Sequence, residues 1–263
     1  MTDLRALLGV ANEAMNRAAA IVSEKAVGTV TAKGDRDMVS ELDVAVEEDL
    51  RAFLSAETPE VGFLGEEQGG RGLSSECTWS LDPIDGTANL VKGLPLCGIS
   101  LGLFQDGRAV LGVIDLPFLG ERYEAAEGHG AYRAGQRIRP SGTARMCDAV
   151  VAIGDYAVGD GAVERNRQRL EVTRLLAERA LRIRMLGSAA IDLTWVASGR
   201  IDATIALSNH PWDMAAGVAI AREAGAHVMD TDGQPHRLTS TATITAAPGL
   251  RDQILELLRE SAP

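Results

Sequence analysis

The residue types best suited to chemistry in this chain are concentrated between positions 82 and 87. Asp82 and Asp85 directly follow a short apolar, strand-like run at residues 79–81, and Gly86 and Thr87 come next. Carboxylates at the end of a strand can hold hard cations, and backbone N–H groups at the start of a helix can bind an anion. This combination predicts a metal-assisted reaction on a phosphate group.

Three further acidic residues lie at the ends of predicted elements rather than on solvated helix faces. Asp43 lies near the start of one predicted helix, Glu66 follows a short strand, and Asp213 lies at the start of another helix. A ligand set made only of oxygen atoms favours Mg²⁺ or Mn²⁺ over zinc, and no histidine lies at metal-ligand spacing with these residues. Thr87 adds a hydroxyl group that can orient a water molecule.

The first half of the chain is predicted to contain helices and a largely antiparallel sheet. Apolar residues at helical spacing predict a helix over residues 4–22, and Ser40 is a suitable N-cap for a second helix that ends near residue 54. Residues 28–37 and the polar stretch 69–76 are expected to be loops. Strands are predicted at residues 61–64, 98–105, 108–115, 121–126 and 130–138, with a hairpin turn at Asp106-Gly107.

The second half alternates between the two kinds of element. Strands are predicted at residues 149–153, 182–186, 201–207, 227–229 and 242–246. Helices are predicted at residues 162–180, 188–198, 212–224 and 250–259. This alternation indicates an α/β layer, so we expect an N-terminal α+β lobe at residues 1–145 and a C-terminal α/β lobe at residues 146–263.

Length and composition exclude several classes of protein. With 263 residues, 46% of them hydrophobic, the chain can bury a sizeable core. The net charge of −11 argues against a nucleic-acid-binding surface. No apolar run is long enough to span a bilayer, and Met1-Thr2-Asp3 leads directly into an amphipathic segment with no signal-peptide pattern. Three scattered cysteines without a CxxC motif indicate reduced thiols, so we expect a cytoplasmic protein without membrane contact.

Five blocks, in the right order along nearly the whole chain, resemble the signature blocks of the inositol monophosphatase family. They are residues 33–43, 65–67, 82–89, 186–193 and 211–217. The family belongs to the Mg²⁺-dependent, lithium-sensitive phosphatase superfamily that also contains fructose-1,6-bisphosphatases. The resemblance implies an alternating α-β-α-β-α sandwich, a homodimer, and hydrolysis of a small phosphate monoester without a covalent enzyme intermediate.

The resemblance also implies metal ligands and catalytic residues. Glu66, Asp82 and the backbone carbonyl of Ile84 would hold a first Mg²⁺, and Asp82, Asp85 and Asp213 a second. A third, weaker ion would lie near Glu66, and Li⁺ would inhibit by taking the second site. Asp43 and Thr87 would activate the attacking water, with Glu66 helping to place it.

Other residues are assigned to the substrate by the same resemblance. The N–H groups of Gly86 and Thr87 would bind the phosphate, and Lys33 would assist electrostatically. The candidate substrate-side residues are Asp85, Gly187, Ser188, Ala189, Ala206 and His210. For His210, next to Trp212, substrate contact and simple packing are equally good interpretations. Asp192, within a predicted helix, is expected to be structural.

The chain departs from the family pattern at two positions. Ser40 stands where the family usually has Thr, which keeps the hydroxyl. Ala206 stands seven residues before Asp213, where inositol-specific members usually carry a Glu that binds substrate hydroxyls. Losing that charged acceptor costs about 1.5–3 kcal/mol for a polyol substrate.

Several substrates therefore remain open. They are an inositol monophosphate or related cyclitol phosphate, histidinol phosphate, and a sugar, nucleotide or specialised-metabolite phosphate. Histidinol phosphate would require an acidic pocket, which Ala206 does not supply. A non-catalytic regulatory protein of the same fold is an alternative of another class, and it would be expected to lack at least one metal ligand.

Overall fold

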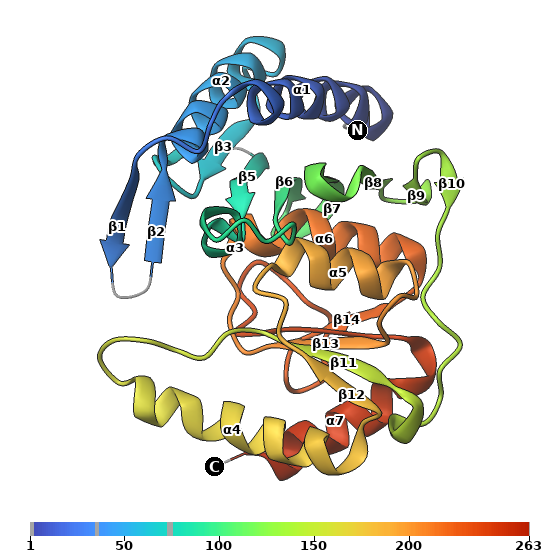
Figure 1. Cartoon of the computed structure of the whole chain (residues 1–263). Helices are drawn as coiled ribbons and strands as arrows, with labels where there is room; N and C mark the ends of the chain where they lie inside the picture. The colour runs from blue at the N-terminus through green and yellow to red at the C-terminus, as the bar shows by residue number, and fades with distance from the viewer. Residues whose placement is uncertain (1–2, 35–36, 73–75, 263) are drawn as a thin grey trace.

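Helices and sheets alternate in five layers in the computed structural model, which describes residues 3–34, 37–72 and 76–262 (Figure 1). Helices α1 (Leu4–Glu24) and α2 (Glu41–Glu57) cover one face of the first large sheet. Helices α5 (Ala189–Ala197) and α6 (Pro211–Ala224) lie between the two large sheets, and α4 (Ala162–Arg179) and α7 (Arg251–Glu260) cover the far face of the second. The expected α-β-α-β-α sandwich is confirmed.

The first large sheet has eight strands in the order β10-β9-β8-β7-β6-β5-β3-β4. Only the β3–β5 pair is parallel among these described strands, so the sheet is largely antiparallel, as predicted. The strands are β3 (Gly62–Gly65), β4 (Gly69–Arg71), β5 (Cys77–Asp85), β6 (Gly98–Gln105), β7 (Arg108–Leu116), β8 (Glu121–Ala126), β9 (Gly130–Arg133) and β10 (Gln136–Arg137). The short helix α3 (Thr87–Val91) follows β5.

The second large sheet has five strands in the order β12-β11-β13-β15-β14. Strand β11 is parallel to β12 and β13, whereas β15 is antiparallel to β13 and β14. The strands are β11 (Val150–Ile153), β12 (Arg182–Arg184), β13 (Ala203–Ala206), β14 (His227–Met229) and β15 (Thr243–Ala246). Single 3₁₀ turns occur at Pro117–Leu119, Met146–Asp148 and Pro248–Leu250.

Two of the expected loops contain strands. Strands β1 (Val30–Gly34) and β2 (Asp37–Ser40) form an antiparallel hairpin where residues 28–37 were expected to be a loop. The β-branched residues Val30, Thr31 and Val39 favour extended backbone, and cross-strand pairing outweighs the local glycine signal. Strand β4 likewise lies within the expected loop 69–76, because its backbone completes the edge of the first sheet beside β3. Positions 35–36 and 73–75 of these two predictions lie outside the described residues.

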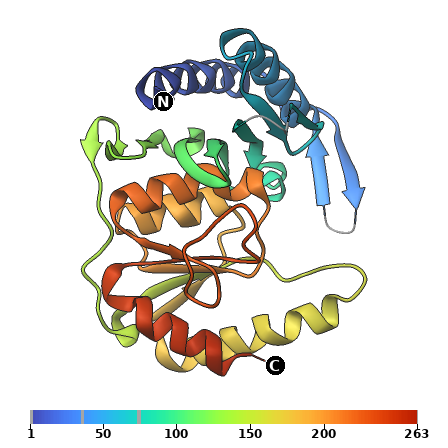
Figure 2. The ribbon, with the colours of Figure 1, turned by 180° about the vertical axis from the view of Figure 1, so that it is seen from behind.

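Small residues let α6 approach the first sheet very closely. A Cβ atom on Gly102 would lie 2.5 Å from the Cβ of Ala215, and one on Gly112 would lie 2.3 Å from the carbonyl oxygen of Ala216. The view from behind also shows α6 between the two sheets (Figure 2). This packing brings Asp213, in the first turn of α6, toward the ends of β5 and β6.

No helix in the described part of the chain is long and apolar enough to cross a membrane.

Candidate active site

Four acidic side chains are brought together where β3 and β5 end. These two strands are parallel, and the backbone N–H of Glu66 donates to the carbonyl of Leu81 (3.2 Å), so Glu66 lies beside Asp82. Asp82 accepts a hydrogen bond from the backbone N–H of Ile84 (2.9 Å). Burial and then the charges of Glu66, Asp85 and Asp213 raise the pKa of Asp82 well above its usual value. The structure therefore places these predicted residues in one acidic cluster.

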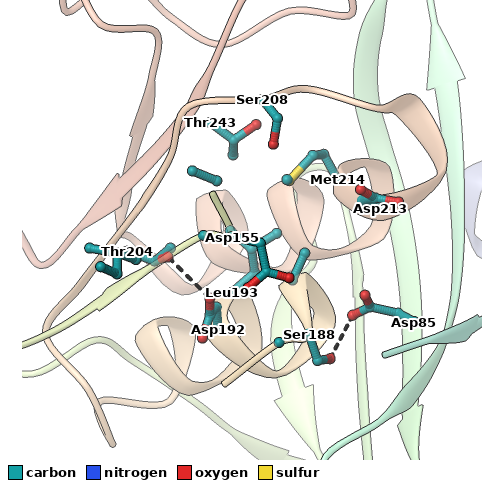
Figure 3. A pocket seen from close by; sticks show the side chains of 15 residues that line it. Asp85, Asp155, Ser188, Asp192, Leu193, Thr204, Ser208, Asp213, Met214 and Thr243 are labelled. Carbon is teal, nitrogen blue, oxygen red and sulfur yellow. Dashed lines mark hydrogen bonds between the residues drawn. The ribbon is translucent and has the colours of Figure 1, made fainter. Parts of the chain in front are cut away.

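Asp85 is fixed by the start of α5. Its Oδ2 accepts hydrogen bonds from the Ser188 hydroxyl and from the backbone N–H of Ala190, both at 2.6 Å (Figure 3). Burial raises the pKa of Asp85 to about 6, even though these two hydrogen bonds act in the opposite direction. The predicted substrate-side block thus contacts the acidic cluster directly.

A cationic group already lies against this cluster. The Nζ of Lys33, on the β1–β2 hairpin, is 2.7 Å from Glu66 Oε1 and 2.8 Å from Glu67 Oε1. Burial alone would lower the pKa of Lys33, but the two ion pairs outweigh it and raise that pKa above its usual value. Glu66 is therefore oriented toward a positive charge in this structure.

The cluster has the donor chemistry of a hard-cation site. Within residues 3–34, 37–72 and 76–262, no three His, Cys, Asp or Glu side chains are gathered around one point as a preformed metal cage. The carboxylates are nevertheless close enough to destabilise one another's charged forms, as the raised pKa of Asp82 shows. Oxygen donors that carry an excess of negative charge, even with Lys33 beside them, fit Mg²⁺, which would relieve this repulsion.

Asp43 and Thr87 form the predicted pair. Asp43 is fully buried, and its Oδ1 accepts a hydrogen bond from the Thr87 hydroxyl (3.0 Å). Its Oδ2 accepts from the backbone N–H of Ser40 (3.0 Å) and from the Ser40 hydroxyl, which completes a capping box at the start of α2. The hydroxyl that Ser40 shares with Thr is therefore the feature that the site uses.

Gly86 has a backbone conformation that other residues rarely adopt. Its φ angle is +90°, and a Cβ atom there would lie 2.9 Å from the carbonyl oxygen of Leu96. This turn ends β5 and starts α3, so it sets the position of Thr87 at the first turn of the helix.

Sequence reasoning missed Glu47, which holds the turn that carries Glu66. Glu47 is fully buried and accepts hydrogen bonds from the backbone N–H groups of Glu67 (2.8 Å) and Gln68 (2.9 Å). Arg51 pairs with it at 2.7 Å. The signal that could have found it is the four-residue spacing of Asp43, Glu47 and Arg51, which places all three on one face of α2.

Sequence reasoning also assigned no role to Asn89. Its Nδ2 donates to the carbonyls of Leu96 (2.7 Å) and Leu186 (2.8 Å). One amide group therefore ties the acidic block to the block that precedes α5.

A cavity of about 140 Å³ opens beside the acidic cluster. Two of the predicted metal ligands, Asp85 and Asp213, line this cavity. Asp192, which was expected to be structural, lines it as well. Figure 3 shows Asp85 and Asp213 on one side of this cavity and Asp192 with Thr204 on the other. The predicted substrate-side residues that line it are Gly187, Ser188, Ala189 and Ala206.

His210 lies next to this cavity in sequence but stacks on Trp212, with ring centroids 5.5 Å apart and planes 12° from parallel. It is the N-cap residue of α6 and is not among the described residues that line the cavity. A direct contact between His210 and a substrate stays a prediction.

The fold and the acidic site define a phosphoric monoester hydrolase, and comparison with known proteins assigns its family. The model of the inositol monophosphatase family matches residues 3–262, and the chain belongs to this family. It is 36% identical over 260 residues to inositol-1-monophosphatase ImpA of Mycolicibacterium smegmatis, covering 98% of this chain and 94% of the relative. It is 38% identical over 238 residues to a probable inositol 1-monophosphatase ImpA of Mycobacterium tuberculosis, covering 90% and 87%.

Solved structures agree with this assignment. The extragenic suppressor protein suhB from Bartonella henselae superposes with a TM-score of 0.89 and 32% identity, covering 98% of this chain and all (100%) of that one.

Proposed function

We propose that this chain is a Mg²⁺-dependent phosphatase that releases phosphate from a small metabolite, inositol 1-phosphate or a related cyclitol or sugar phosphate. The observation that carries the proposal is the hydrogen-bonded pair Asp43–Thr87 next to the carboxylates of Glu66, Asp82, Asp85 and Asp213. The names of the relatives support an inositol phosphate as substrate.

The acidic cluster is the proposed metal centre. Glu66, Asp82, Asp85 and Asp213, with the backbone carbonyl of Ile84, would hold two to three Mg²⁺ ions, and Mn²⁺ could substitute. When bound, the ions supply Lewis acidity and neutralise the charge of the phosphate group.

Asp43 and Thr87 are proposed to activate the attacking water. When the Thr87 hydroxyl donates to Asp43, its oxygen lone pairs are left to accept a proton from a water molecule. As the water attacks, its proton passes to the Thr87 oxygen while the Thr87 hydroxyl proton passes along the same hydrogen bond to the Asp43 carboxylate, so Thr87 stays neutral. Glu66 helps to place the water. Ser40 keeps Asp43 in place through this step.

The phosphate is proposed to lie at the turn after β5. Backbone N–H groups of Gly86 and Thr87 would donate to its oxygens, and Lys33 would add positive charge nearby. The reaction is a direct displacement by water, so no residue is bonded covalently to phosphorus.

Other family properties are carried over as part of the proposal. We infer a cytoplasmic homodimer that Li⁺ inhibits, with two lobes at residues 1–145 and 146–263 and the active site between them. The position of Asp213 in the second half, against ligands from the first, supports that placement.

The test is phosphate release with Mg²⁺ from inositol 1-phosphate, histidinol phosphate, fructose 1,6-bisphosphate, 3′-phosphoadenosine 5′-phosphate, AMP and glycerol 2-phosphate. We expect EDTA to abolish release and Asp82→Asn to lower kcat/KM by about 10³-fold, since several kcal/mol of transition-state stabilisation depend on this ligand. Mg²⁺ should also raise the melting temperature of the wild type but not of Asp82→Asn.

Release that is insensitive to EDTA and to Asp82→Asn would contradict the proposed metal centre. If the wild type released no phosphate from any ester, the non-catalytic regulatory alternative would replace the proposal.

A further inference from the structure

One carboxyl group in the cavity beside the acidic cluster has no role in the proposed mechanism. Asp192, on α5, is only 5% exposed. Its Oδ2 lies 3.4 Å from the hydroxyl of Thr204, a long hydrogen bond, and its buried Oδ1 has no hydrogen-bond partner among the described residues. A buried carboxyl oxygen that lines a cavity without a donor is costly to keep, unless a ligand supplies that donor.

The walls of the cavity indicate which chemistry the ligand has. Asp155, exposed two residues after the end of β11, adds another carboxylate to the cavity. Burial first, and then the charges of Asp85 and Asp155, raise the pKa of Asp192 well above its usual value. The described lining contains neither Lys, Arg nor His, and its polar side chains are carboxylates, which include Asp85 and Asp213, and hydroxyls. The cavity therefore suits a group rich in hydrogen-bond donors, such as hydroxyls or an ammonium group.

The geometry of β13 explains why Asp192 can take this role. Thr204 and Ala206 are two residues apart on this strand, so both face the same side, toward α5. The small methyl group of Ala206 stands where inositol-specific members of the family usually carry a Glu side chain. It leaves room in the cavity and leaves Asp192, on the neighbouring helix, as the buried acceptor.

The size of the cavity limits the ligand. The volume of the cavity is about 140 Å³. This is enough for a compact ring or a short chain, but it is smaller than the pockets that bind drug-sized ligands.

We propose that Asp192 determines specificity on the alcohol side of the site by accepting a hydrogen bond from an O–H or N–H⁺ group of the leaving alcohol. This inference rests on the proposed function, which places the phosphate at the neighbouring turn of Gly86 and Thr87. It moves the acceptor role from position 206 on β13 to position 192 on α5, and it restores the acidic pocket that an amine-bearing substrate requires.

The test compares two variants on three substrates. Asp192→Leu removes the acceptor at nearly constant shape, and Asp192→Asn removes only the negative charge. The substrates are inositol 1-phosphate, whose leaving group carries hydroxyls, histidinol phosphate, whose leaving group carries an ammonium group, and phenyl phosphate, whose leaving group carries no donor. Asp252→Asn, at an exposed position of α7, is the matched control.

We expect Asp192→Leu to raise KM about tenfold or more for the preferred donor-bearing substrate, as the loss of a hydrogen bond to a charged group does. KM for phenyl phosphate and kcat for all three should change little. If the preferred leaving group is cationic, Asp192→Asn should raise KM as strongly as Asp192→Leu. If it is a neutral polyol, Asn can still accept, and the effect should be small.

The inference is overturned if the Asp192 variants alter all three substrates equally, or if they change only the melting temperature. That result would give Asp192 a purely structural role. Turnover by the wild type would still support the proposed function. If the wild type hydrolysed none of the three esters in Mg²⁺, the proposed function would fail first, and this inference with it.

Discussion

At the scale of single residues, the site depends on hydrogen bonds that fix the position and orientation of its carboxylates. Asp43 is bonded to Ser40 on one oxygen and to Thr87 on the other, so its position does not depend on substrate. Asp85 is bonded to Ser188 and Ala190, which hold one of its oxygens away from the cluster. Neutral donors thus orient both acids, and a bound cation would compensate the charge of Asp85.

Removal of the Thr87 hydroxyl should lower the catalytic rate much more than the stability of the fold. Thr87→Val keeps the shape of the side chain but removes the hydroxyl that is proposed to link Asp43 to the attacking water. We expect kcat for inositol 1-phosphate to fall about 10²–10⁴-fold, as when general-base assistance is lost. The free energy of unfolding should fall by only about 1 kcal/mol, since Asp43 keeps its bonds to Ser40.

Thr87→Ser is the matched control, because it keeps the hydroxyl and should retain most of the wild-type kcat. Equal losses of kcat in the Val and Ser variants would show that Thr87 acts through packing and not through its hydroxyl.

Local spacing predicted part of this site and could not predict the rest. Asp82 and Asp85 are three residues apart at a strand end, and that short-range pattern is visible in the sequence. Glu47 acts on backbone N–H groups 20 and 21 residues away. Asp192 is separated from Thr204 by 12 residues. Such contacts depend on how elements pack, so each residue seen alone resembles an ordinary helix acid.

At the scale of elements, helix α6 links the second half of the chain to the first sheet. Its residues Ala215, Ala216 and Gly217 are small where it meets β6, β7 and α5, and Gly102 and Gly112 are small on the facing strands. Close approach of the backbones places Asp213 with the acidic residues at the ends of β3 and β5. The packing of α6 and the composition of the proposed metal site are therefore coupled.

Gly112→Ala tests this coupling. The added Cβ would lie 2.3 Å from the carbonyl oxygen of Ala216, which is backbone and cannot rotate away. We expect the free energy of unfolding to fall by about 1–3 kcal/mol, as in other overpacked cores, and kcat to fall because α6 carries Asp213. Denaturant midpoints and phosphate release measure the two effects.

Gly9→Ala in α1 is the matched control, since a Cβ there would have no heavy atom of the described residues within 4 Å beyond its chain neighbours and the backbone of its own helix. It should stabilise the protein by about 0.5–1 kcal/mol through helix propensity. A Gly112→Ala protein as stable and active as the wild type would show that α6 can move without cost to the site.

Periodicity predicted the elements well wherever one face is buried. The helices of the second half lie within one or two residues of their predicted bounds, because apolar residues recur at helical spacing along each of them. The β1–β2 hairpin was missed because β1 is exposed along its length and has no alternating pattern. Its role, to bring Lys33 to Glu66, is not visible in local composition.

At the scale of the whole molecule, the order of elements along the chain does not follow the order of layers. Helices α5 and α6 belong to the second half of the chain, but they form the layer that lies between the first sheet and the second sheet. The division into lobes at residues 145 and 146 therefore stays a prediction about sequence segments. The alternating pattern predicted an α/β layer in the second half, whereas the full α-β-α-β-α sandwich was expected from the family resemblance.

Global stability should depend on pH through buried groups whose protonation differs between the folded and unfolded states. His236 is 2% exposed, and its Nε2 lies 3.1 Å from Asn209 Oδ1 and 3.0 Å from Thr243 Oγ1. Burial and then the charge of Arg222 lower the pKa of His236 to about 4 from 6.5. Burial raises the pKa of Asp82 and Asp85, so these carboxyls favour folding as the pH falls.

The contribution of His236 has the opposite sign and can be isolated by His236→Gln. Because its folded pKa is depressed, the unfolded chain binds the proton first, so the stability from neutral His236 is complete above pH 6.5 and is lost as the pH falls toward 4. Denaturant unfolding in EDTA should show the stability of the wild type relative to His236→Gln falling by about 3 kcal/mol across that window. The carboxyls affect both proteins equally and cancel in the difference. A difference that stayed constant from pH 7 to pH 4 would mean that His236 has the same pKa in the folded and unfolded states. The Asn209–His236–Thr243 contacts would then tolerate a charged imidazole at low pH.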